Sequence, residues 1–158
     1  MGRGVLSQGN AMQTFRDNAG TPWELSINVA SMRRVRDVLG VNLGTIIDGR
    51  LMQQILDDPA LLGDILYVLC KTQCDERKIS DYDFGASLAG ESIEAATNAL
   101  LQELIDFFPP AKRAMLNQLR GLLRSAENNA VQLVMDRIVN PNPLTSGEPS
   151  TNAPESVA

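Results

Sequence analysis

The sequence has no histidine among its 158 residues, only two cysteines, and few aromatic residues. Histidine is the commonest general base and the commonest metal ligand in proteins. Its absence excludes a Ser-His-Asp triad, a Cys-His catalytic pair and any zinc site that uses histidine. The sequence also lacks the roughly 18 consecutive apolar residues of a transmembrane helix, and its first residues contain no apolar core of signal-peptide length. We therefore expect a cytosolic protein with no membrane contact.

An excess of basic residues is also missing, since 14 Lys and Arg stand against 19 Asp and Glu. A general nucleic-acid binder needs clustered Lys and Arg to neutralise phosphates, so no nucleic-acid partner is expected. The acidic charge is concentrated in the middle of the chain. Residues 51–110 carry three basic and eleven acidic groups, whereas residues 1–50 carry six basic and four acidic ones.

An alternating pattern predicts one β-hairpin near the N-terminus. Apolar and polar residues alternate over 23–29, which places Trp23, Leu25, Ile27 and Val29 on one face of a strand. Residues 14–16 supply a short partner strand, and 17–20 supply a turn because Asn and Gly tolerate positive φ. Since an isolated hairpin is marginal, it is expected to lie on an apolar surface.

After this strand the apolar spacing becomes helical, and caps or breakers bound each segment. The predicted helices run from Ser31 as cap through Leu39, over 51–56, from Asp58-Pro59 to about Gln73, from Ser80 to before Gly90, and over 91–108. The residues predicted to face inward are Met32, Val35, Val38 or Leu39, Leu62, Ile65, Leu66, Leu69, Phe84, Leu88, Ile93, Ala96, Leu100, Leu104 and Phe107.

A last helix is predicted from about Pro110 to Val139. Apolar residues recur in it every three or four positions, at Leu116, Leu119, Leu123, Ala126, Ala130 and Leu133. This spacing fits a coiled-coil seam with another chain, but also a long helix packed across its own domain. We expect the intramolecular arrangement.

The whole pattern predicts a mainly α fold, a compact multi-helix domain with a short N-terminal β-hairpin. This single domain covers 13–140, after a flexible N-terminal arm at 1–12. Residues 141–158 are rich in Pro, Asn, Ser and Thr with almost no large apolar residue, so a disordered C-terminal tail is expected.

No set of residues combines into a catalytic, cofactor or metal site. Cys70 and Cys74 share a helix face, but no third Cys and no His completes a tetrahedral set, so both are expected to be small buried or half-buried residues with reduced thiols. Asp81, Asp83 and Glu91 do not match a calcium loop and are expected to interact with helix N-termini.

Two further patterns also carry no chemistry. The glycines at 40–44 lack both the third Gly of a dinucleotide fingerprint and the Lys of a P-loop. Glu103 and Asp106 share a helix face, but nothing in the sequence indicates a cleft around them. We expect no enzyme activity and no cofactor.

A basic cluster, Arg33, Arg34 and Arg36, follows the predicted strand. On a helix Arg33 and Arg36 share a face while Arg34 diverges. Such a cluster is commonly a solvated face, and the alternative is pairing with an acidic partner surface. With the acidic middle of the chain it would form opposite poles that permit head-to-tail self-association, so a homo-oligomer is one expectation.

The order of elements, together with several short segments, resembles a known family over about residues 12–139. The segments are 15–20 with 23–29, 33–36, 40–43, 56–59, 83–85, 88–90, 91–96 and 106–109. In this order they resemble the small, mostly helical tail assembly chaperones of long-tailed bacteriophages.

The resemblance implies a non-enzymatic protein of the host cytoplasm. Its partners would be the phage tape measure protein, which such chaperones bind and keep soluble, and the tail tube protein, whose subunits they help to recruit. The alternative is a structural virion protein, a head-tail or tail subunit, that self-associates.

Candidate contact residues follow from the expected helical partner. They are the exposed parts of the Leu116, Leu119 and Leu123 seam and the flexible side chains of Met52, Met115 and Met135. The competing expectation, which we favour, is that all six belong to the core. The arginine cluster at 33, 34 and 36 is the other candidate partner-binding group.

Overall fold

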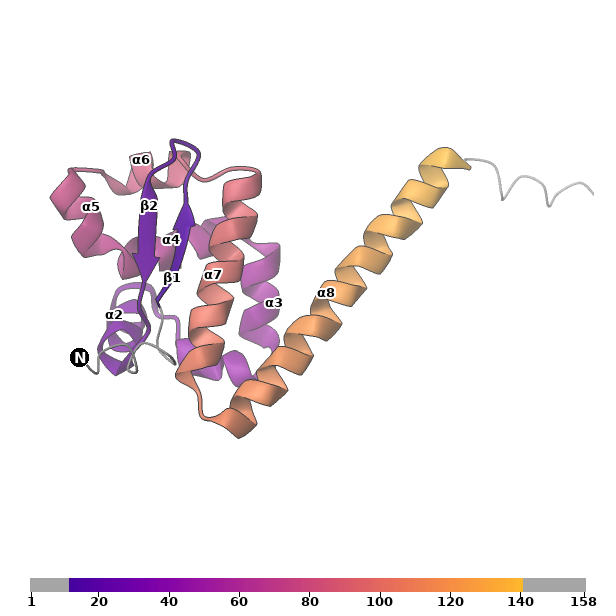
Figure 1. Ribbon diagram of the computed structural model, residues 1–158, viewed down its shortest axis with the longest axis horizontal. Helices are drawn as coiled ribbons and strands as arrows, with labels where there is room; N and C mark the ends of the chain where they lie inside the picture. The colour runs from indigo at the N-terminus through magenta and orange to yellow at the C-terminus, as the bar shows by residue number, and fades with distance from the viewer. Residues whose placement is uncertain (1–11, 141–158) are drawn as a thin grey trace, which may run out of the picture. The chain divides into compact units, whose positions relative to one another are not determined.

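The structure is a computed structural model that describes residues 12–140 (Figure 1). Its elements are β1 (Gln13–Arg16), β2 (Pro22–Leu25), α2 (Val29–Leu39), the 3₁₀ helix η1 (Leu43–Asp48), α3 (Arg50–Asp57), α4 (Pro59–Leu69), α5 (Lys71–Arg77), α6 (Asp81–Ala86), α7 (Glu91–Phe107) and α8 (Pro110–Val139). The mainly α fold with an N-terminal hairpin is thus confirmed. The predicted tail at 141–158, and all but the last residue of the predicted arm, lie outside the described residues.

The chain divides into two compact units, one ending at Arg120 and the other beginning at Gly121, so α8 contributes to both. The buried apolar residues of the described chain all lie between Phe15 and Leu116, in the first unit.

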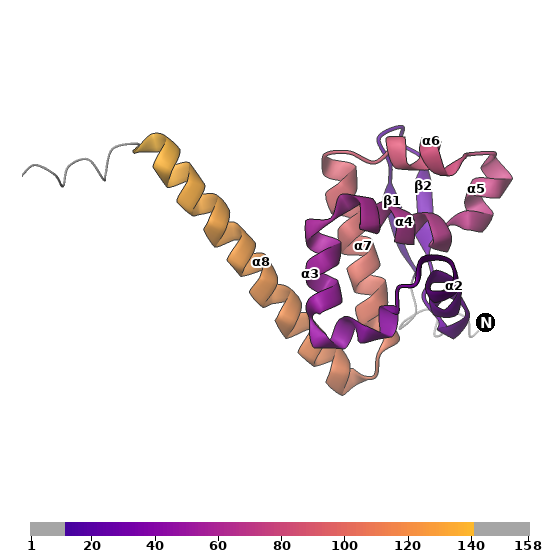
Figure 2. The same ribbon diagram turned by 180° about the vertical axis from the view of Figure 1, so that it is seen from behind.

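The hairpin pairs β1 and β2 antiparallel, with Phe15 opposite Trp23. Both side chains are buried, and α7 packs against β1 beside it (Figures 1 and 2). Trp23 meets Phe84 of α6 edge to face, with ring centroids 5.0 Å apart. The expectation that the hairpin lies on an apolar surface is therefore confirmed.

The second strand is shorter than the predicted one, and the helix after it begins earlier. Asn28 caps α2 by accepting from the Ser31 backbone N–H at 2.9 Å, while the Ser31 hydroxyl accepts from the Asn28 N–H. This reciprocal capping box ends the extended segment before Val29, which is exposed. The prediction of Ser31 as the cap is therefore wrong, because Ser31 occupies the third helical position.

The prediction of a single helix from Pro59 to Gln73 is also wrong, because the helix is interrupted at Cys70 and the chain continues as α5. The break brings α5 alongside the hairpin. There the Gln73 side chain donates to the Glu24 carbonyl at 2.8 Å and accepts from the Glu24 N–H at 3.0 Å. These bonds satisfy backbone groups on the open edge of β2, which would otherwise lack a partner.

Several other helix ends agree with the local signals, but α6 ends at Ala86, so Leu88, which was expected in this helix, lies beyond it. Asp58 caps α4 with Pro59 in its first position, Gly40 ends α2 with φ of 73°, and Ser80 caps α6. Pro109 separates α7 from α8. The helix η1 was not predicted. The α4 helix is the central element and packs against α2, α3, α6 and α7.

Candidate interaction surfaces

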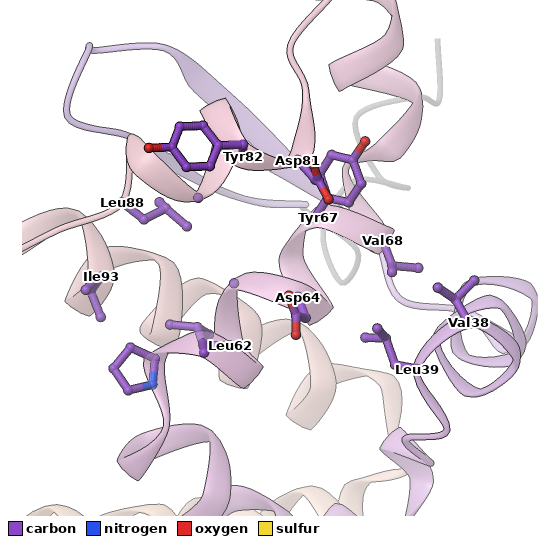
Figure 3. Close-up of a pocket in the computed structure, with 14 residues that line it drawn as sticks. Val38, Leu39, Leu62, Asp64, Tyr67, Val68, Asp81, Tyr82, Leu88 and Ile93 are labelled. Atoms are coloured by element: carbon purple, nitrogen blue, oxygen red, sulfur yellow. The ribbon is translucent and has the colours of Figure 1, made fainter.

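An open groove with a volume of about 700 Å³ lies over α4. Figure 3 shows Val38 and Leu39 of α2 on one side of it and Leu62, Leu88 and Ile93 on the other. Val38 is 63% exposed and Tyr82 is 79% exposed, so the walls present apolar and aromatic surface to solvent. Of the two residues between which the inward position was left open, Leu39 is half-buried and Val38 is exposed.

The charged residues at this groove are all acidic. Asp64 of α4 and Asp81 of α6 line it and are exposed. None of the described residues that line it is Lys or Arg. We refer to this surface, defined by Val38, Leu39, Leu62, Asp64, Asp81 and Tyr82, as the acidic groove. It favours a partner that combines apolar side chains with positive charge.

A smaller pocket of about 290 Å³ brings two of the predicted arginines together with the end of α7. Arg33 and Arg36 line it with Val29 and Met32 of the same helix and with Phe107 and Phe108, and two residues between α2 and α3, Asn42 and Gly44, complete the lining. The two phenyl rings meet edge to face at 5.2 Å. Phe107, predicted to face inward, is 37% exposed and presents part of its ring here. We refer to these eight residues as the basic pocket.

Arg34 is exposed and does not line the basic pocket. The prediction that Arg34 points away from the face shared by Arg33 and Arg36 is therefore confirmed. The charge of Arg36 is only weakly compensated, because its Nε lies 3.8 Å from the Asp37 carboxylate and both side chains are exposed.

The predicted seam of α8 divides along its length. Leu116 is 1% exposed, so it belongs to the core and offers no surface to a partner. Leu119 and Leu123 are half-buried, whereas Ala126, Ala130 and Leu133 are exposed. The expected packing of the seam within the domain is confirmed for Leu116, and for the residues beyond Arg120 it stays a prediction. Of the three methionines, Met52 is buried, while Met115 and Met135 are each more than half exposed.

The second unit exposes an apolar stripe that the predicted seam missed. Val131, Val134, Met135 and Ile138 follow the spacing i, i+3, i+4, i+7 on one helix face, and each exposes more than half of its surface. We refer to these four residues as the α8 stripe. Leu133 does not belong to this face and is also exposed, so the helix presents apolar side chains on more than one side.

The half-buried carboxylate of Glu103 in α7 has structural partners. The Glu103 carboxylate accepts from the backbone N–H groups of Gln13 and Ile27 at 3.1 and 3.2 Å. Burial, aided by the nearby Asp106, raises the pKa of Glu103 despite these two donors. The carboxylate pair that the sequence offered therefore contains one group that fastens the hairpin to α7.

Both cysteines are buried, as predicted. Burial and the neighbouring Cys74 raise the pKa of the Cys70 thiol to about 12, and burial also raises the pKa of Cys74. At neutral pH these thiols are protonated and weakly nucleophilic. The Cys70 Sγ lies 3.9 Å from the Glu24 carbonyl oxygen, beneath β2.

Within residues 12–140 no cluster of three or more Cys, Asp or Glu side chains is placed to hold a metal ion. No helix in the same range is both long and apolar enough to cross a membrane. Comparison with models of protein families, with curated proteins and with solved structures gave no match.

Proposed function

We propose that this protein is a non-enzymatic binding protein that covers an amphipathic helix of a partner. Its role would be that of a tail assembly chaperone in the host cytoplasm, with the phage tape measure protein as the partner and tail tube subunits recruited to the complex. The observation that supports helix binding most directly is the exposed α8 stripe.

Residues in the stripe and directly before it are unfavourable for a helix that stands alone in water. Asn128, Asn129, Val131 and Val134 all have lower helix propensity than Ala or Leu. Most helical stability in proteins comes from packing an apolar face, and a helix that is apolar on several sides is normally buried. A packed partner therefore accounts for both the length and the composition of this helix.

A second helix is the partner whose surface matches the stripe best. The i, i+3, i+4, i+7 spacing allows side chains to pack into the grooves of another helix. A tape measure protein, as the resemblance implies, is a long amphipathic helix that aggregates when its apolar side chains are exposed. Covering it would remove that surface from water, and the net negative charge of this protein would keep the complex soluble.

The test is co-expression of the tagged protein with the tape measure protein of the same phage. We expect the two to co-purify, and the tape measure protein to be insoluble alone. The variant Val134→Ser/Ile138→Ser removes five methyl or methylene groups from the stripe. Each group contributes roughly 0.8 kcal/mol when it is buried against the partner. The co-purified amount should therefore fall at least tenfold.

The matched control is Asn128→Ser/Gln132→Ser, which changes two exposed polar residues of the same helix. It should leave co-purification unchanged. Equal loss in both variants would mean that helix formation, not the apolar stripe, is what the partner needs.

Quantitative mass spectrometry of lysates and purified particles separates the chaperone from a structural virion protein. A chaperone is abundant in the lysate and absent from finished particles. Stoichiometric presence in particles would contradict the proposal and favour a structural head-tail or tail subunit.

A further inference from the structure

We infer that the protein self-associates head to tail, with the acidic groove of one copy receiving the basic pocket of the next copy, including the face of α2 that carries Arg33 and Arg36. Both surfaces belong to the first unit. The inference goes beyond the proposed function and does not rest on it, since neither surface includes the α8 stripe.

Charge complementarity is the first observation that carries this inference. Asp64 and Asp81 line the groove without any Lys or Arg, and Arg33 and Arg36 line the pocket without any Asp or Glu, among the described residues. All four side chains belong to exposed residues. Opposed surfaces of this kind attract each other, and like surfaces of two copies repel, so the unlike pairing is selected.

The second observation is that both surfaces have exposed apolar groups beside their charges. Val38 and Tyr82 project at the groove, and Val29 and Phe107 project at the pocket. Apolar and aromatic side chains surrounded by polar ones are the usual composition of a specific interface. Two charged surfaces that only contact water gain nothing from exposed apolar side chains at their centres, so a contact with another surface explains them better.

The third observation is that the exposed α2 residues of the two surfaces lie on opposite sides of the helix, with Arg33 and Arg36 on one side and Val38 on the other. Arg33 and Arg36 share a face with Val29, whereas Val38 is nine residues from Val29, which is two and a half turns of an α-helix at about 3.6 residues per turn. One copy can therefore use both surfaces at once. A contact between unlike surfaces is heterologous, so it extends into a chain or closes into a ring instead of stopping at a two-fold dimer.

The test is sedimentation velocity of the full-length protein over a concentration series. We expect the sedimentation coefficient to rise with concentration at low salt, and the association to weaken at least tenfold between about 50 and 500 mM salt because the charges are exposed. The charge-reversal variants Asp64→Lys/Asp81→Lys and Arg33→Glu/Arg36→Glu should each remain monomeric.

Mixing the two variants gives the decisive measurement. The first retains an intact pocket and the second an intact groove, so an equimolar mixture has one productive contact. The other possible contact joins the altered groove of the first variant to the altered pocket of the second. Their reversed charges are also opposite in sign, but the side chains that carry them do not have the native geometry. We expect association in the mixture at least tenfold stronger than in either variant alone.

Controls separate this contact from general charge effects and from the α8 stripe. Arg34→Glu and Glu76→Lys change exposed charges outside both surfaces and should leave association within twofold of the wild type. Val134→Ser/Ile138→Ser should also leave it unchanged. Circular dichroism should show the same helix content in every charge variant.

Three results would overturn the inference. They are a wild-type protein that stays monomeric throughout the series, charge-reversal variants that associate as the wild type does, and a mixture that does not associate. Loss of association in the α8 variant alone would assign self-association to that helix instead. If the groove binds a basic amphipathic peptide while the protein stays monomeric, its occupant is another protein.

Discussion

Asp17 is the residue on which the hairpin turn depends. Its buried carboxylate accepts hydrogen bonds from the backbone N–H groups of Ala19 and Thr21 at 2.9 and 3.0 Å, and from the indole N–H of Trp23 at 3.0 Å. Burial acts to raise the pKa of this carboxyl group, but the donors outweigh it and the pKa lies below its ordinary value of 3.8. The charged form is therefore favoured by folding.

The substitution Asp17→Asn should lower the free energy of unfolding by about 1–3 kcal/mol at pH 7, because an amide cannot accept from all three donors. A depressed pKa in the folded state gives stability above the unfolded pKa that is lost as pH falls through the folded one. The difference between wild type and variant should therefore shrink below about pH 4. Urea denaturation at pH 7 and at about pH 2.5 measures it.

Asp136→Asn, at an exposed position, is the control and should change little at either pH. A deficit in Asp17→Asn that is the same at both pH values would show that the charge of Asp17 does not stabilise the turn.

The candidate site residues show which part of such a site a sequence can reveal. Arg33 and Arg36 were predicted because they stand close together in the chain. Asp64 was one of many acidic residues in the middle segment, and only the packing of α6 against α4 brings it to one groove with Asp81. Phe107 was expected in the core because it continues the helical spacing of the inward-facing residues. That spacing does not show that part of its ring stays exposed.

At the level of elements, the predictions succeeded where a local interaction sets a boundary. Pro59 and Gly40 act through their own backbone geometry, so Asp58-Pro59 begins α4 and Gly40 ends α2 as predicted. The break at Cys70 could not be predicted, since it serves hydrogen bonds between Gln73 and Glu24, 49 residues apart. Periodicity alone could not say either that the second half of α8 is exposed.

The start of α3 provides a test at this level. Gly49 has φ of 86°, which L residues rarely adopt, and a Cβ there would lie 3.1 Å from the Leu119 Cδ2 of α8. Gly49→Ala should therefore lower the free energy of unfolding by about 1–2 kcal/mol through backbone strain and displacement of Leu119. Denaturant titration measures the change.

Gly63→Ala is the matched control. Gly63 lies inside α4, and apart from its chain neighbours and the backbone of its own helix no atom lies within 4 Å of an added Cβ. Ala is the better helix former by about 1 kcal/mol, so this variant should be as stable as the wild type or more so. Destabilisation of similar size in both variants would contradict the explanation from the geometry of Gly49.

For the whole molecule, the two proposed contacts have a joint consequence. A chain of copies joined through the first unit would present several α8 stripes, and a long helical partner offers several binding sites. Once one stripe is bound, the next binds from a high effective concentration, so modest contacts add to a large total affinity. Loss of self-association in Asp64→Lys/Asp81→Lys should then also weaken co-purification of the partner.

The division of the chain after Arg120 leads to a prediction about the stability of a truncated chain. A chain that ends at Arg120 retains every buried apolar residue of the described range, up to Leu116. It also retains the bonds from Arg120 to the side chains of Gln102 and Asn98, at 3.0 and 3.3 Å. Residues 121–139 supply no buried apolar side chain.

The truncated chain should therefore unfold within a few degrees of the full-length protein and keep the same near-ultraviolet signal of Trp23. Its far-ultraviolet helix signal should decrease, because the last two thirds of α8 are removed. A chain that ends at Pro109 is the contrast. It loses Leu116 and Arg120, and the loss of a fully buried leucine alone costs about 2–5 kcal/mol. If the chain ending at Arg120 were equally unstable, residues beyond it would be required for the fold, and the exposed helix would be a structural element of the domain instead of a surface for a partner.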